Sequence, residues 1–195
     1  MKIASIDQSL SCTALILWED GEPTERFVFR SGNSNAKGRI KGVPYFDIED
    51  KRMDHITEKV IQVLIEFQPH KISMESLSYG SMGNATRDLG GLFYVMRSAF
   101  FLEFGNWNIL EHYTPMTLKK IAREFLPEDQ RTVPKPSGKK GTNLRKMEKT
   151  DMVSAIPDEH RWILDGYKMT GINSGLGDLS DAYFLGVHCL QINGG

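Results

Sequence analysis

The sequence has 195 residues, of which 40% are hydrophobic and 25% are charged, a composition typical of a globular chain and not of a disordered one. A formal net charge of −1 excludes a protein that is basic throughout. We find no apolar stretch of about 18 residues and no signal-like N-terminus, so we expect a cytoplasmic protein without a membrane span, folded as one domain over residues 1–195. Cys12 and Cys189 lie in apolar runs without metal-ligand spacing, which favours buried, reduced thiols.

The first thirty residues predict an antiparallel meander. Residues 2–7 and 12–18 are apolar runs, and residues 25–30 alternate between polar and apolar side chains. The segments between them, QSLS and DGEP, have the composition of tight turns.

From residue 47 onward, helices and strands alternate. Apolar residues recur at helical spacing over 47–67, and Pro69 ends that helix. The further elements predicted are strands over 71–75 and 106–113 and helices over 84–104, 115–125, 146–156 and 177–191. This order predicts an α/β fold with a mixed five-stranded sheet, residues 2–7 at its centre and helices on both faces.

Four acidic residues lie at the ends of these elements. Asp7 ends the first strand, Glu75 ends the fourth, and Asp178 and Asp181 are one turn apart at the start of the last helix. If the four carboxylates converge, a cation has to offset their repulsion, and hard oxygen ligands select Mg²⁺ or Mn²⁺. Two such ions can activate water and stabilise the leaving oxygen of a phosphodiester. Each acid alone is equally explained as a turn residue or as a favourable charge at a helix N-terminus.

The order of these motifs resembles a known family. The segments IASIDQSLSCTALIL, KISMES, TPMTLKKIA and GDLSDAYFLGVH, which together span nearly the whole chain, are similar to the RuvC family of RNase H-like Holliday-junction resolvases. The resemblance implies an RNase H-like fold and two Mg²⁺ ions, replaceable by Mn²⁺, held by Asp7, Glu75, Asp178 and Asp181. It also implies a homodimer that nicks two strands of a four-way DNA junction symmetrically.

The same resemblance implies that the helix after Glu75 pairs the subunits. Residues 84–104 are apolar almost all round, which fits a dimer helix and a buried core helix equally well. Other features depart from the family. The glycine that usually follows the first aspartate is missing, and Tyr79, the nearest candidate for an aromatic that opens the junction, is out of register by one. The preferred junction and cleavage sequence therefore stay open.

A basic segment provides candidate DNA contacts. Residues 131–149 hold seven basic side chains and one acidic side chain, within and after a Pro- and Gly-rich loop at about 127–145. We expect lysines there to replace counterions on phosphates, although a solvated loop without a role has the same composition. One of them is also expected to reach the scissile phosphate. The candidate DNA-binding residues are Lys139, Lys140, Arg145, Lys146, Tyr79, Lys37 and Arg39, and Lys149 is an alternative on the helix side.

Three other functions are open. An RNase H-like nuclease acting on flapped, RNA-containing or other branched substrates would use the same four acids. A non-catalytic DNA-binding protein could keep the fold, but we would then expect acids to be missing. An ATP-binding protein of the sugar-kinase and actin type would need glycine-rich phosphate loops, which the sequence lacks. By analogy alone, a compact chain of this kind suits a bacteriophage protein that clears branched DNA.

Overall fold

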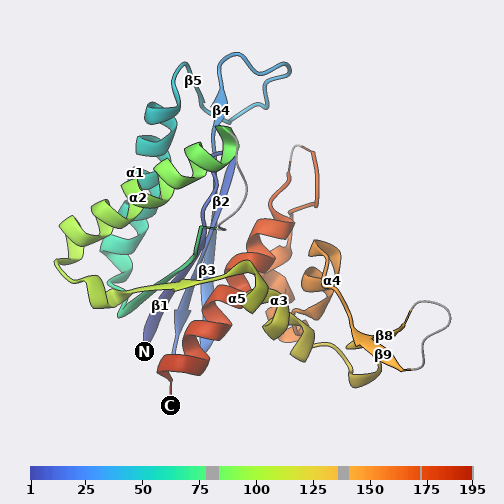
Figure 1. Cartoon of the computed structure of the whole chain (residues 1–195). Coiled ribbons are helices and arrows are strands. Elements are labelled where there is room, and N and C mark those ends of the chain that lie inside the picture. Colours follow the sequence, from blue (N-terminus) through green and yellow to red (C-terminus); the bar gives the residue numbers. More distant parts are fainter. Residues whose placement is uncertain (78–83, 136–140, 172, 195) are drawn as a thin grey trace.

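A computed structural model describes residues 1–77, 84–135, 141–171 and 173–194. Its main sheet has the order β3-β2-β1-β6-β7 (Figure 1). The strands are β1 (Lys2–Asp7), β2 (Cys12–Glu19), β3 (Glu22–Arg30), β6 (Lys71–Glu75) and β7 (Leu110–Tyr113). Strand β1 pairs antiparallel with β2 and parallel with β6, and β7 is parallel to β6. The predicted mixed sheet with residues 2–7 at its centre is confirmed.

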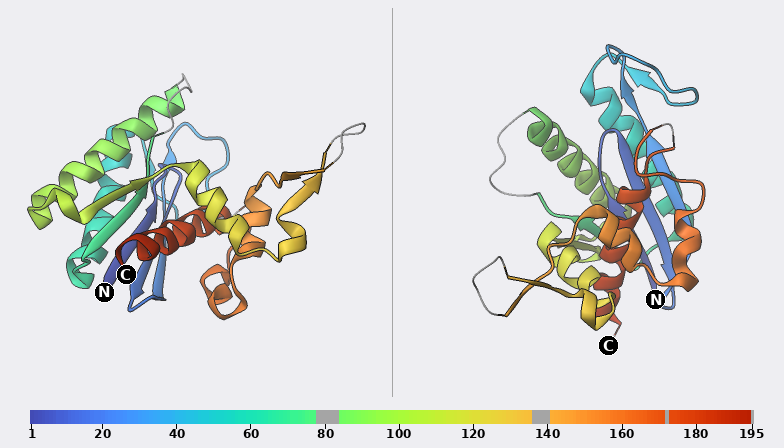
Figure 2. Two further views of the ribbon diagram at one scale, coloured as in Figure 1. Left: turned by 60° about the horizontal axis from the view of Figure 1, so that its bottom comes forward. Right: turned by 90° about the vertical axis from the view of Figure 1, so that its right-hand side faces the viewer.

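Helices cover both faces of the sheet, as predicted (Figures 1 and 2). Helices α1 (Glu49–Phe67) and α2 (Asn84–Phe104) pack on one face, and α3 (Pro115–Glu124), α4 (Lys149–Ala155) and α5 (Leu176–Asn193) lie on the other. Each face of the sheet has its own hydrophobic core, and β1 contributes to both because successive side chains point to opposite faces. Ile3 packs on the side of α5, and Ala4 and Ile6 pack on the side of α1.

Helix α5 lies directly against the sheet. Its residue Gly186 sits over Trp18 of β2, and a Cβ atom there would come within 2.3 Å of the indole ring. Glycine therefore permits an approach that any side chain would block. The indole donates to Ser5 Oγ at 2.9 Å, so its one polar group is satisfied in the core. This close packing fixes the start of α5 next to the end of β1.

Several element boundaries differ from the predictions. Strand β3 begins at Glu22 and not at residue 25, because the turn is confined to Asp20 and Gly21, both with positive φ. Pro23 was read as a turn residue, but an edge strand tolerates a proline. A 3₁₀ helix, Trp107–Ile109, occupies the start of the predicted strand 106–113. Helix α4 starts at Lys149 and not at 146, because the Glu148 N–H donates to Asp151 Oδ2 at 3.0 Å and fixes the first turn.

Two short strand pairs lie outside the predicted strands and helices. Strands β4 (Gly32–Asn33) and β5 (Tyr45–Phe46) are parallel, and β8 (Thr132–Pro134) and β9 (Thr142–Leu144) form an antiparallel pair within the basic segment. In the views of Figures 1 and 2 this second pair projects away from the sheet beyond α3. Two further 3₁₀ helices are Glu128–Gln130 and Asp158–Leu164.

Both cysteines are buried free thiols, as predicted. No helix in the described ranges combines the length and the hydropathy needed to cross a bilayer.

Candidate active site

The parallel pairing of β1 and β6 brings the first two acids together. The last paired residues are Ile6 and Met74, so Asp7 and Glu75 follow side by side at the carboxyl ends of their strands. Beyond the pairing, the Gln8 side-chain N–H donates to the carbonyl oxygen of Glu75 at 2.7 Å. Gln8 thus extends the connection between the two strands at the point where the carboxylates emerge.

Helix α5 supplies the other two acids. Asp178 and Asp181 lie on its first turns and line one cavity of about 340 Å³ together with Asp7 and Glu75. The other residues that line this cavity are Ser9, Pro115, Leu118, Lys119, Lys149 and Met152. Four acids from distant parts of the chain therefore line one cavity, and their role as metal ligands stays a prediction.

The cavity concentrates negative charge in a partly desolvated place. Burial and then the charges of Asp181, Glu75 and Asp178 raise the pKa of Asp7 well above its usual value. Burial, followed by the charge of Asp181, raises the pKa of Glu75 to about 7. Burial likewise raises the pKa of Asp181. These shifts mean that the ionised acids need a positive partner.

Lys149 is such a partner. Its Nζ lies 3.2 Å from Asp181 Oδ2 and 3.6 Å from Asp178 Oδ1. Burial alone would lower the pKa of Lys149, but the charges of Asp181, Asp7 and Asp178 outweigh it and the pKa is raised. The lysine stem passes over Gly177, where a Cβ would lie only 2.8 Å from its Cδ. Gly177 therefore leaves room for the ammonium to reach the acids.

Lys119 also lines the cavity, and it was not among the predicted site residues. It comes from α3, whose buried face carries Leu118, Ile121 and Ala122. A lysine on such an amphipathic helix has the pattern of an ordinary surface residue. The segment TPMTLKKIA, which was part of the family resemblance, was the available signal.

The donors fit a hard divalent cation by chemistry, because all four are carboxylates. Over residues 1–77, 84–135, 141–171 and 173–194, however, no three acidic, histidine or cysteine side chains stand close enough to ligate one ion. The fit to a cation is therefore one of donor chemistry, and the four side chains do not form an assembled group of ligands.

Four of the residues predicted to contact DNA are described by the structure and lie outside the acidic cavity, namely Lys37, Arg39, Arg145 and Lys146. Arg145 forms an ion pair with Asp151 at 2.7 Å, and Lys146 forms one with Glu148 at 3.2 Å. Neither lines the acidic cavity. Lys37 and Arg39 are exposed in the loop before β5, with Arg39 over the ring of Tyr45 at 5.3 Å. Tyr79, Lys139 and Lys140 lie outside the described residues. Among the described residues, the lysines that line the cavity are Lys149, which was named as an alternative on the helix side, and Lys119.

Comparisons with solved structures identify the fold. No family model and no curated protein matches the sequence. T. thermophilus RuvC in complex with a Holliday junction substrate superposes with a TM-score of 0.62 and 15% identity, over 100% of this chain and 97% of that one. T. thermophilus RuvC alone superposes with a TM-score of 0.58 and 14% identity, over 97% of each chain. The yeast mitochondrial Holliday junction resolvase Ydc2 superposes with a TM-score of 0.55 and 14% identity, over 94% of this chain and 75% of that one. The predicted similarity is confirmed at the level of structure: this chain has the RuvC-like, RNase H-like fold.

Proposed function

We propose that the protein is a divalent-metal-dependent endonuclease that cuts branched DNA, with the four-way junction as its first candidate substrate. The observation that carries the proposal is the single cavity lined by Asp7, Glu75, Asp178 and Asp181. Support comes from the fold, since one solved structure with this fold is described as holding a Holliday junction substrate and another as a Holliday junction resolvase.

In this proposal the four carboxylates hold two Mg²⁺ or Mn²⁺ ions. Bound there, the ions would supply activated water and neutralise charge on the leaving oxygen. Lys119 and Lys149 line the same cavity and carry positive charge toward it. Once Lys149 has left its two aspartates, its ammonium is free to bind a phosphate oxygen of the DNA. Pro115, Leu118 and Met152 form the apolar part of the lining.

We also propose that the protein acts as a homodimer through α1 and α2. A groove of about 590 Å³ lies between these helices and includes Ile61, Tyr94 and Leu102. Tyr94 is 58% exposed and Leu102 is 83% exposed, which is unusual for large apolar side chains on one helix. A second copy packing on this surface would bury both, and two copies would present two acidic cavities to one junction.

The test is cleavage of a panel of synthetic DNA substrates: a four-way junction, a three-way junction, a flap, an RNA–DNA hybrid and a plain duplex. Each is incubated with Mg²⁺, Mn²⁺, Ca²⁺ or chelator. We expect Mg²⁺- and Mn²⁺-dependent nicks at symmetric positions in the junction. Preferred cutting of flaps or hybrids would instead support the alternative function, a nuclease for flapped or RNA-containing substrates. Tight junction binding without cutting in any metal would favour a non-catalytic binder.

A further inference from the structure

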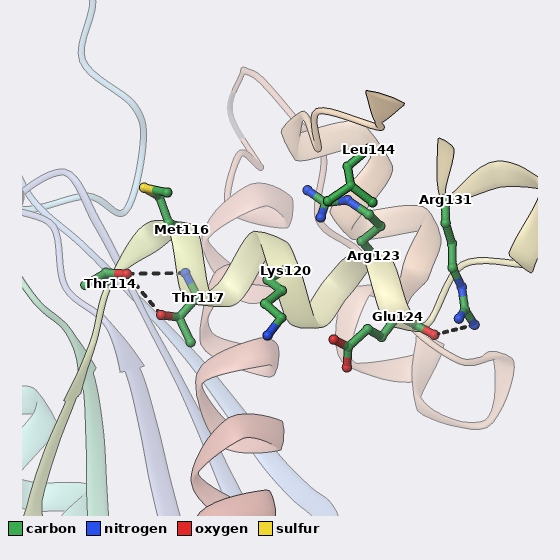
Figure 3. A pocket seen from close by; sticks show the side chains of 8 residues that line it. All are labelled: Thr114, Met116, Thr117, Lys120, Arg123, Glu124, Arg131 and Leu144. Carbon is green, nitrogen blue, oxygen red and sulfur yellow. Dashed lines mark hydrogen bonds between the residues drawn. The ribbon is translucent and has the colours of Figure 1, made fainter. Parts of the chain in front are cut away.

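A second hollow lies on the exposed side of α3, next to the acidic cavity. It has a volume of about 700 Å³. Its lining, drawn in Figure 3, consists of Thr114, Met116, Thr117, Lys120, Arg123, Glu124, Arg131 and Leu144. We call it the α3 groove. Met116, Lys120 and Arg123 are four and then three residues apart and so share one face of the helix, while Leu144 joins from β9.

The groove and the acidic cavity share one helix. Pro115, Leu118 and Lys119 line the acidic cavity, and their neighbours Met116 and Lys120 line the groove. Since an α-helix is only about 10 Å across, a DNA strand held at the acids reaches the groove by passing over α3.

The groove is positively charged and its arginines are held in position. Arg123 Nε donates to the carbonyl oxygen of Arg145 at 2.8 Å, and Arg131 donates from Nε and Nη2 to the carbonyls of Leu126 and Glu124, both at 2.8 Å. A carbonyl orients a guanidinium without neutralising it, and each guanidinium has further N–H donors. Lys120 is exposed and has no ion pair within the described part of the chain. The three cations outnumber Glu124, so the groove favours phosphate groups.

The groove also carries exposed apolar side chains. Met116 is 82% exposed and Leu144 is 68% exposed. The outside of a DNA duplex presents phosphates and sugars, and its base faces are stacked away. Apolar side chains beside cations match an unpaired nucleotide, which offers a base face together with its phosphate.

We propose that the α3 groove binds unpaired nucleotides of the DNA strand whose phosphodiester lies in the acidic cavity. The groove would thus select the single-stranded part of a branched substrate. This inference rests on the proposed nuclease function, because the groove is assigned to the same strand. The competing assignment is that the groove binds a base-paired arm of the substrate. The experiment distinguishes binding of unpaired nucleotides from binding of paired DNA.

The experiment measures binding by fluorescence anisotropy to two DNAs: a fork with two single-stranded arms, and the same duplex without arms. The protein carries D181N so that no DNA is cut. We expect M116A/L144A to weaken binding to the fork roughly fivefold or more, because apolar contacts with the base faces are lost, and to change duplex binding less than about twofold. For the fork, we expect K120E to reduce the slope of log affinity against log salt concentration by about one. K59E, on α1 across the sheet, is the matched control and should change neither value.

Each outcome decides the proposal. Equal losses of M116A/L144A binding to fork and duplex would overturn the assignment to unpaired nucleotides. Unchanged fork binding by both variants would overturn the groove itself, while Mg²⁺-dependent cleavage by the wild-type protein would leave the proposed function standing. A wild-type protein that neither binds nor cuts branched DNA would overturn both. Because Met116, Leu144 and Lys120 are exposed, the variants should keep the wild-type melting temperature, which circular dichroism checks.

Discussion

Lys149 Nζ lies 3.2 Å from Asp181 Oδ2, where the side chain of the lysine enters a cavity lined by four acids. A protein cation thus stands beside the carboxylates that we assign to a metal. In the proposed function the ammonium and the metal would compete for the same oxygens. Lys149 would then have two opposed effects: it would oppose metal binding in the DNA-free protein, and it would support binding of the DNA phosphate once it is displaced.

Replacing Lys149 should separate these effects. In K149M we expect Mn²⁺ to bind the DNA-free protein more tightly at pH 8, by about an order of magnitude if roughly 1.4 kcal/mol of competition is removed. Cleavage should fall by about a hundredfold or more, as when one group that stabilises transition-state charge is lost. Calorimetric titration with Mn²⁺ measures the first effect and single-turnover cleavage the second. K2M is the control, since Lys2 pairs with Glu19 at the opposite end of β1 from Asp7. Weaker Mn²⁺ binding by K149M would contradict the competition.

The raised pKa of Glu75 predicts a pH-dependent stability of the metal-free protein. Its pKa rises from 4.5 to about 7 on folding, so the folded state holds this proton more tightly than the unfolded state. The contribution is complete below pH 4.5 and is lost as the pH rises through 7. E75Q lacks this titrating group, so only the wild-type protein loses the contribution. In chelator, the free energy of unfolding of E75Q minus that of wild type should therefore increase by roughly 2 kcal/mol between pH 4.5 and 8. Urea melts at several pH values measure it. A difference that does not change with pH would contradict the shift.

Gln8 is expected to position Glu75. Its side chain is buried and connects the ends of β1 and β6 through the 2.7 Å hydrogen bond to the Glu75 carbonyl. In Q8A we expect a stability loss of about 1 kcal/mol, typical of one hydrogen bond. Loosened carboxylate positions should raise the Mn²⁺ concentration needed for half-maximal cleavage, and excess Mn²⁺ should restore the rate. S11A, at an exposed position of the same turn, is the control. An unchanged metal dependence would mean that Gln8 is only structural.

The dimer proposal predicts that charge on α2 separates the subunits. L102E should convert a dimer to a monomer in sedimentation velocity at micromolar concentration, because a desolvated carboxylate is strongly unfavourable in an interface. The nearly complete exposure of Leu102 means that the variant should still fold. I192E is the matched control, since Ile192 is 56% exposed on α5. If the wild-type protein is a monomer, or if L102E remains a dimer, this surface is not the interface.

The sequence predicted the sheet and the acids because both depend on strong local patterns. Apolar runs with tight turns defined β1 and β2, and an acid directly after a buried strand, as at Asp7 and Glu75, points to a site at the sheet edge. Of the two cavity lysines, Lys149 was named only as one of several alternatives in the basic segment, and Lys119 was not named. Lys149 depends on the packing of α4 beside α5, and Lys119 on the orientation of α3, and neither is encoded by spacing.

The β8–β9 pair and the α3 groove could not be predicted for a similar reason. Proline, glycine and lysine dominate residues 131–149, and this composition is typical of an irregular loop. The groove combines α3 with Leu144, about twenty residues farther along the chain, and the hydrogen bond from Arg123 to the Arg145 carbonyl joins them. Such a contact appears only once the tertiary structure is known.

The most direct measurement is cleavage of a four-way junction by D181N, together with Mn²⁺ binding by the same protein. We expect cleavage to be abolished and Mn²⁺ affinity to fall at least about tenfold, while junction binding is kept or strengthened because a negative charge facing phosphate is removed. D7N should behave alike, and D158N, at a 93% exposed aspartate outside the cavity, should match wild type. A D181N protein that binds Mn²⁺ and cuts the junction as wild type does would contradict the assignment of the four acids.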